Sequence, residues 1–351
     1  MNKPFQGLAA AVGAAGLLCA TAASAQSNSV VIYGLMDAAV RHVNNADANR
    51  ASLTTMEDGI FTGSRLGFRG REELGNGMAA LFTMEAGFDP SSGTSLQGSP
   101  AGDYGQIATP SRLFGREVHV GLRGASWGLT VGRQYTIGHT MTARFQPQGN
   151  PNNNALSIFS SHHVARQDNV LRVDARLGGV ELAVAHTFGE TADADANGTW
   201  AVGASYSTGP VWAGAYAQRM KNLADTETRK IVGLGASYKL LPALTLYGGT
   251  MRRTHETSPQ ENKVYTLALS YDITPAVNLS FAHLADDQSG SAVLDGSRKV
   301  SYVTASYRFS RRSDVYGVMD RNSVRGGYAK PAFMGTLGTQ NAFTVGLRHR
   351  F

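Results

Sequence analysis

Apolar and polar residues alternate with a period of two along most of the chain. In residues 77–88, for example, Met78, Phe82 and Met84 share one parity, whereas Thr83 and Glu85 share the other. Successive side chains of a β-strand point to opposite faces of its sheet, so this pattern predicts strands with one apolar and one polar face. Helical periodicity is nowhere as strong, and we therefore expect an all-β protein.

A short motif that ends in Ser-Tyr indicates how the strands are connected. Its tyrosines, Tyr206, Tyr238, Tyr271 and Tyr307, follow one another at spacings of 32, 33 and 36 residues, which is one pair of strands each time. Tight reversals are expected at 73–77, 124–127, 178–179, 207–210, 240–243, 272–275 and 310–313. Long polar connections are expected at 42–60, 89–111, 137–166, 189–198, 221–228, 254–262, 285–298 and 322–340.

Seven short turns that alternate with eight long loops make sixteen strands, the first near 29–41 and the last near 341–351. A soluble β-sandwich or propeller buries its apolar faces against each other and has no reason to keep its turns short at one end only. A transmembrane barrel has this asymmetry, together with an apolar outer band, a polar lumen and aromatic girdles. Lipid cannot hydrogen-bond the backbone, so the sheet has to close on itself. We therefore expect a sixteen-stranded antiparallel transmembrane β-barrel, in which the four tyrosines belong to one girdle.

Composition supports this interpretation and indicates the compartment. The mean hydropathy is -0.19, and there is no apolar run of about 20 residues that could form a membrane-spanning helix. Residues 1–25 carry Lys3, then an apolar stretch, then Ala23-Ser24-Ala25, which is typical of a secretory signal peptide. We expect residues 26–351 to form the barrel domain. The single cysteine, Cys19, lies in the signal peptide, so disulfides are not expected to stabilise the barrel.

Several segments together resemble Gram-negative porins of the neisserial and Burkholderia-Bordetella type, the betaproteobacterial general porins. They are 30–34 (VVIYG), 64–70 (SRLGFRG), 114–116 (FGR), 132–134 (GRQ) and 345–351 (VGLRHRF). The resemblance covers both ends and most of the first half of the chain, and the middle strands match only in pattern.

This resemblance implies a homotrimer in the outer membrane of a Gram-negative cell, with its third loop folded into the lumen. It implies contact with outer-membrane lipid and lipopolysaccharide, and recognition of Phe351 by the barrel-assembly machinery. Phe351 can also be a girdle aromatic that closes the sheet against the first strand, and the two roles are compatible.

The candidate constriction combines arginines of the wall with the third loop. Residues 137–164 contain one arginine, Arg144, and three histidines but neither Asp nor Glu, unlike the acidic third loop of many general porins. Across the lumen we expect an arginine-rich wall. Its candidate members are Arg65, Arg69, Arg116, Arg133, Arg166 and Arg172.

Simple alternation points two of these residues the wrong way. Arg116 shares the parity of Val118, and Arg133 shares that of Val131. An arginine that faces lipid at mid-membrane costs about 2–4 kcal/mol, so we expect a bulge or local shift that turns both side chains inward. Alternatively, either side chain reaches the interface or forms a structural pair with Asp37, Glu85 or Glu117.

A wall of arginines favours a channel that prefers anions. Screening is incomplete over about 8 Å at physiological salt, and guanidinium binds carboxylate or phosphate reversibly. We therefore expect a passive diffusion channel for small hydrophilic solutes with anion preference. A channel specific for one carboxylate or phosphate is an alternative, and a surface adhesin or structural barrel with a blocked lumen is an alternative of another class.

Other kinds of chemistry are not expected. The His162-His163 pair has no third metal ligand at a suitable spacing, so we expect an exposed polar pair and no metal site. No Ser-His arrangement predicts catalysis, and no phosphate-binding loop predicts a cofactor. The net charge of +6 is scattered along the chain, which disfavours nucleic-acid binding.

Overall fold

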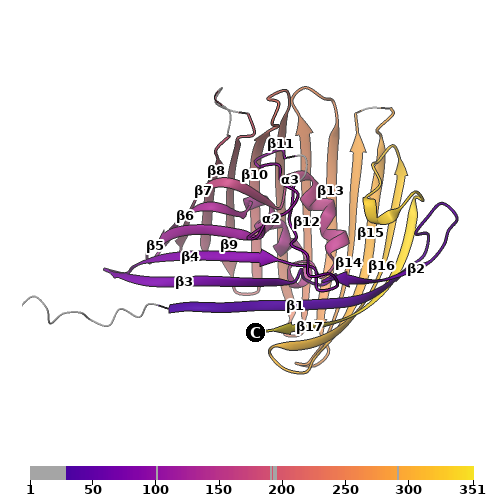
Figure 1. The fold of residues 1–351 in the computed structure, drawn as a ribbon, viewed down its shortest axis with the longest axis horizontal. Helices are drawn as coiled ribbons and strands as arrows, with labels where there is room; N and C mark the ends of the chain where they lie inside the picture. The colour runs from indigo at the N-terminus through magenta and orange to yellow at the C-terminus, as the bar shows by residue number, and fades with distance from the viewer. Residues whose placement is uncertain (1–28, 100–101, 190–191, 193–195, 291) are drawn as a thin grey trace, which may run out of the picture.

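The computed structural model describes residues 29–99, 102–189, 192, 196–290 and 292–351. The predicted signal peptide, residues 1–25, lies outside the described residues. Within them, seventeen strands form one antiparallel sheet (Figure 1). The strands are β1 (Ser29–Val43), β2 (Leu53–Asp58), β3 (Arg65–Gly75), β4 (Met78–Gly87), β5 (Glu117–Arg123), β6 (Trp127–Tyr135), β7 (Arg166–Leu177), β8 (Val180–Thr187), β9 (Thr199–Thr208), β10 (Val211–Lys221), β11 (Thr228–Leu241), β12 (Leu244–His255), β13 (Glu261–Asp272), β14 (Val277–Ser289), β15 (Gly296–Arg308), β16 (Ser313–Gly326) and β17 (Thr339–Arg350).

Helices are few and short. They are α2 (Ile137–Thr142) and α3 (Asn153–His163), with the 3-10 helices η1 (Ala143–Phe145), η2 (Pro147–Gly149) and η3 (Ala332–Met334). In the described part of the chain, none of the helices has the length and apolar character needed to cross a bilayer.

The sheet is a closed barrel with sixteen wall positions. Strand β1 pairs with β17 on one side; on the other it pairs first with β3, along Ser29 to Leu35, and then with β2, along Ala38 to Val43. Strands β2 and β3 therefore share one wall position, separated by a break at 59–64, and the seventeen described strands fill sixteen positions. The sixteen-stranded barrel is confirmed.

The last residue takes part in the closure. The backbone N–H groups of Gly34 and Phe351 each donate to the carbonyl of the other at 3.1 Å. A Cβ atom on Gly34 would lie 2.2 Å from the Phe351 ring, so glycine makes room for this aromatic side chain. The expected pairing of the C-terminus with the first strand is confirmed, and recognition of Phe351 by the assembly machinery stays a prediction.

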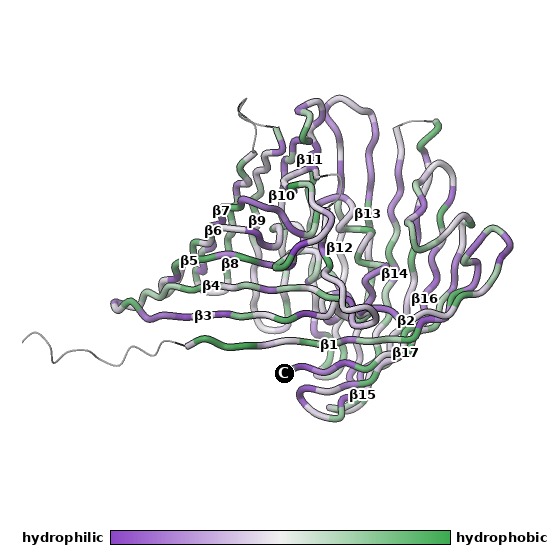
Figure 2. Tube along the Cα trace, in the orientation of Figure 1, coloured by the Kyte–Doolittle hydropathy of each residue, from purple (hydrophilic) through white to green (hydrophobic). Residues whose placement is uncertain are grey.

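Hydrophilic and hydrophobic residues are interspersed along the strands of the wall (Figure 2), and the two faces differ in exposure as the alternation predicts. Leu234 and Leu267 are exposed on the outer face, whereas Asn262 and Thr266 of the opposite parity are buried on the inner face. The repeated tyrosines are exposed near the short turns, as a girdle requires, and are Tyr206, Tyr238, Tyr271 and Tyr307.

Four long connections are shorter than the sequence predicts. The expected loop at 42–60 contains β2, and the expected loops at 254–262, 285–298 and 322–340 contain the ends of strands β12 to β17. These stretches are mostly polar, so the alternation that predicts strands is weak in them. Their hydrogen-bonded ladders nevertheless continue, and an apolar-polar pattern cannot detect them.

Candidate functional site

The segment between β6 and β7, residues 136–165 and called loop 3 below, folds back into the barrel. Helix α2 packs on β8 to β11 and helix α3 on β14 and β15, within the curve of the sheet (Figure 1). Side-chain caps fix where both helices begin: Thr136 Oγ1 accepts from the His139 N–H at 3.2 Å, and Asn152 Oδ1 accepts from the Ala155 N–H at 3.1 Å. The inward third loop implied by the resemblance is present.

An aromatic anchor holds loop 3 against the wall. Phe145 is fully buried, and a Cβ atom on Gly235 or Gly249 would lie 2.3 or 2.5 Å from its ring. The Phe145 ring centroid lies 6.1 Å from that of Trp212 and 6.2 Å from that of Phe159. Two inward-facing glycines therefore form a recess for Phe145, and this apolar contact fixes the position of the loop.

A second attachment lies on the opposite side of the barrel. The backbone N–H of Asn153, the first residue of α3, donates to the carbonyl of Ile60 at 2.9 Å, and its side chain donates to the carbonyl of Gly59. Gly59 and Ile60 belong to the break between β2 and β3. Loop 3 therefore crosses the lumen from β9–β12 to the break.

The first arginine cluster surrounds Glu85. Arg116 donates from Nε to Glu85 Oε1 at 2.6 Å and from Nη2 to the hydroxyl of Tyr135 at 2.6 Å. Tyr33 donates to the other oxygen of Glu85 at 2.9 Å, and Arg65 Nη1 lies 3.9 Å from Oε1. Arg116 precedes the first residue of β5, so the parity of that strand does not apply to it and its side chain turns inward.

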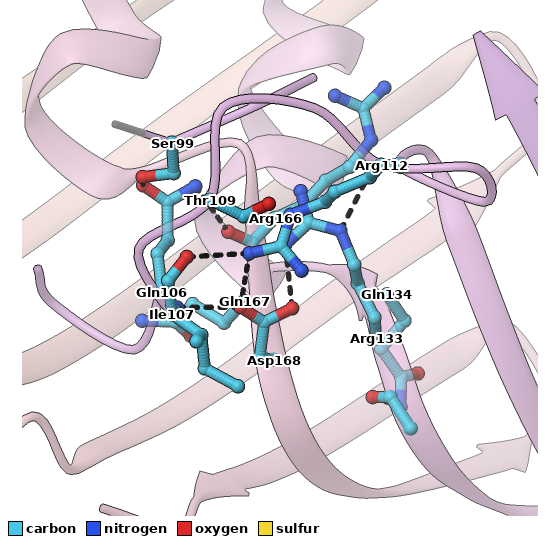
Figure 3. Close-up of polar contacts among 12 residues, drawn as sticks. Ser99, Gln106, Ile107, Thr109, Arg112, Arg133, Gln134, Arg166, Gln167 and Asp168 are labelled. Atoms are coloured by element: carbon cyan, nitrogen blue, oxygen red, sulfur yellow. Dashed lines mark hydrogen bonds and ion pairs between the residues drawn. The ribbon is translucent and has the colours of Figure 1, made fainter. Parts of the chain in front are cut away.

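The second cluster surrounds Asp168 (Figure 3). Arg133 Nη1 and Arg112 Nη2 donate to separate oxygens of Asp168 at 2.8 and 2.9 Å, and the Ile107 N–H donates to one of them at 2.7 Å. The pairing of β6 with β7 shifts between Gly132 and Gln134, where Gly132 has φ of 130°. The bulge expected at Arg133 is therefore present, and it turns this arginine toward Asp168.

Three of the predicted arginines do not pair with Glu85 or Asp168. Arg166 donates to the Tyr135 hydroxyl, and Arg69 is exposed with its Cζ atom 4.9 Å from the Tyr33 ring centroid. Within the described residues neither Arg166 nor Arg69 forms an ion pair. Arg172 pairs with Asp174 at 2.7 Å farther along β7, away from both clusters.

The acidic counterparts proposed from the sequence behave differently from one another. Glu85 pairs with arginine as expected. Asp37 does not pair with arginine. Its carboxylate accepts hydrogen bonds from two uncharged donors, the Tyr316 hydroxyl at 2.6 Å and the Thr62 N–H at 2.8 Å. Within the described residues Glu117 forms no ion pair.

The sequence analysis missed three of the paired carboxylates. Asp168 lies just beyond the predicted loop boundary. Arg41 pairs with Asp320 at 2.7 Å, and Arg348 pairs with Asp314 at 3.1 Å. The inward parity of these residues on the first strand and the last two strands is the signal that could have found them.

The expectation of an exposed His162-His163 pair is wrong. Both side chains are buried because α3 packs against the wall. His162 Nε2 lies 2.7 Å from Asp286 Oδ2, and His163 Nε2 lies 3.1 Å from Thr142 Oγ1. Burial lowers the pKa of His163 to about 4, so this imidazole is neutral at pH 7. No group of three potential metal ligands occurs in the part of the chain that the structure describes.

The family model for Gram-negative porins matches residues 7–327. The chain belongs to this porin family. It is 27% identical to an outer membrane porin protein of Bordetella pertussis, over 96% of the chain and 98% of that relative. It is 24% identical to the major outer membrane protein P.IB of Neisseria meningitidis, over 92% of the chain and 94% of that relative.

Solved structures show the same fold. The anion-selective porin from Comamonas acidovorans superposes with a TM-score of 0.72 at 20% identity, covering 93% of the chain and all of that porin. The trimer form of OmpT from Vibrio cholerae superposes with a TM-score of 0.63 at 12% identity, covering 92% and 99%. The protein is thus a porin of the outer membrane, and its family and fold indicate a channel rather than an enzyme.

Proposed function

We propose that this porin is a passive, water-filled channel for small hydrophilic solutes and that it prefers anions. The charge balance beside loop 3 carries the proposal. Six arginines of β3–β7 and their connections lie there with four carboxylates, which leaves an excess of two positive charges. The arginines are Arg65, Arg69, Arg112, Arg116, Arg133 and Arg166, and the carboxylates are Asp58, Glu85, Glu117 and Asp168.

Loop 3 does not offset this excess, because residues 137–164 contain no acidic residue. Charge in a narrow water-filled passage is incompletely screened, since the Debye length is about 8 Å at physiological salt. Anions are therefore concentrated beside the arginines and cations are depleted. Ion pairs fix Arg116 and Arg133, whereas Arg69 is exposed and free to contact a passing solute.

We also propose that the protein assembles as a homotrimer. The OmpT structure described as a trimer form supports this assembly, since it shares the fold. The exposed apolar outer face is the surface available to lipid, lipopolysaccharide and neighbouring subunits.

The test is the reversal potential of the channel in a planar bilayer under a KCl gradient. The sign expected is that of a channel more permeable to chloride. Arg69→Glu should reduce this preference, while Arg321→Glu, an identical charge change at an exposed outward position on β16, should leave it unchanged. A cation-selective wild-type channel would overturn the anion preference. Current that saturates with one carboxylate would instead show a solute-specific channel, and absence of conductance a blocked barrel.

A further inference from the structure

A polar cavity of about 550 Å³ lies at the short-turn end of β5 to β8. Its lining includes Arg123, Arg172 and Arg176 with the carboxylates of Asp174 and Glu181. Arg123 and Asp174 are both cross-strand partners of Gly128 on β6, so they occupy one level of the wall on its inner face. In outer-membrane barrels the short turns face the periplasm, which places this cavity at the periplasmic mouth.

The charges in this cavity are not balanced. Arg172 pairs with Asp174 at 2.7 Å, and Arg176 pairs with Glu181 at 2.5 Å. Arg123 is exposed and has no hydrogen-bond or ion-pair partner among the described residues. Three guanidinium groups and two carboxylates leave one positive charge, and this charge belongs to a side chain whose donors are all available.

The cavity is separate from the arginine clusters beside loop 3. On β7, Asp168 of the second cluster and Arg172 of the cavity lie four residues apart, which corresponds to about 13 Å along the strand. Arg123 lies seven residues from Arg116, about 23 Å. That distance is more than twice the Debye length of about 8 Å, so salt largely screens the direct interaction between Arg123 and the clusters.

We propose that this cavity is a second binding site for anions, at the periplasmic mouth, which holds the carboxylate or phosphate group of a small solute on Arg123. The proposal rests on the anion preference proposed above and adds a second step to the transit path. Guanidinium offers a planar set of donors that matches both oxyanions. Arg172 keeps its Nη1 donors available, because its contacts with Asp174 use Nε and Nη2.

The experiment measures block of the chloride current by inorganic phosphate and, separately, by succinate, each added to one side of the bilayer at a time. Wild-type channels should show half-maximal block at a lower concentration from one side. Arg123→Gln should raise that concentration about three- to fivefold, the effect of one exposed charge pair. Asp174→Asn should lower it, because it frees Arg172 and removes a negative charge.

Arg71→Gln is the matched control. It removes the same charge near the same end of the barrel, on β3 and outside the cavity, where Arg71 pairs with Glu73 at 2.6 Å. It should change the block less than twofold. Equal effects of Arg71→Gln and Arg123→Gln, or no effect of Arg123→Gln, would overturn the site.

The two proposals fail in different ways. If the wild-type channel is anion-selective but Arg123→Gln does not change the block, only the proposal of the second site is refuted. If the wild-type channel is cation-selective, the proposed anion preference itself is refuted. A block by phosphate alone would identify the preferred group as phosphate, and a block by both probes would identify a general oxyanion site.

Discussion

The contact between Phe145 of loop 3 and its recess in the wall can be tested by making the ring smaller, by making the wall residue larger, and by combining the two substitutions. Phe145→Ala removes a fully buried ring and should destabilise the protein by about 3–5 kcal/mol, as in other cores. Gly235→Ala places a methyl carbon 2.3 Å from the ring, an overlap that should cost about 1–3 kcal/mol. In the double variant the new methyl group occupies space that the ring has left. Its cost should therefore be lower than the sum of the single costs by about 1–3 kcal/mol.

The assay is equilibrium unfolding by guanidinium chloride, followed by tryptophan fluorescence, because Trp212 lies close to Phe145. Gly248→Ala is the matched control: it lies on β12 beside Gly249, and the nearest atom to its added Cβ is 3.5 Å away, so its effect should be small. Open-channel current noise should rise in Phe145→Ala as loop 3 loses its anchor. Additive costs in the double variant would refute the proposed contact between the ring and the recess.

Two further predictions concern buried ionisable groups. Burial lowers the pKa of His163 to about 4, whereas an unfolded histidine titrates near 6.5, so stability should be full above about pH 6.5 and decline as the pH falls toward 4. His163→Gln should reduce that decline in unfolding experiments at several pH values, and an unchanged pH dependence would contradict the assignment. Asp168→Asn leaves Arg133 without a carboxylate and should cost about 3–5 kcal/mol in guanidinium unfolding, whereas the half-exposed Asp174→Asn should cost under about 1 kcal/mol. Equal losses of unfolding free energy in Asp168→Asn and Asp174→Asn would show that the ion pair between Arg133 and Asp168 is solvated.

Alternation was sufficient to predict the barrel because lipid and lumen impose opposite demands on neighbouring residues. Leu267 and Thr266 differ in sequence as they differ in environment. Where both faces of a strand contact water, polar residues such as Asp287 and Arg325 continue β14 and β16 although their pattern is that of a loop.

The membership of the candidate site was predictable only in part, and its pairing was not predictable. Arg116 and Arg133 were expected, whereas Arg112 and Asp168 were missed and Arg172 lies elsewhere. The arginines were found because an inward cation in a membrane strand is conspicuous. Their partners depend on contacts between distant segments, as for Arg133 with Asp168 and Arg41 with Asp320. The burial of His162 and His163 could not be predicted, because it depends on how α3 packs inside the barrel.

Loop 3 is attached to the wall at Phe145 on one side of the barrel and at Asn153 on the other, so it crosses the passage as a rigid segment fixed at both ends. The clearance left for a solute is consequently set by the two anchorages, while the local potential is set by wall residues such as Arg69 that take no part in them. Size exclusion and charge discrimination can therefore be engineered one at a time in this barrel.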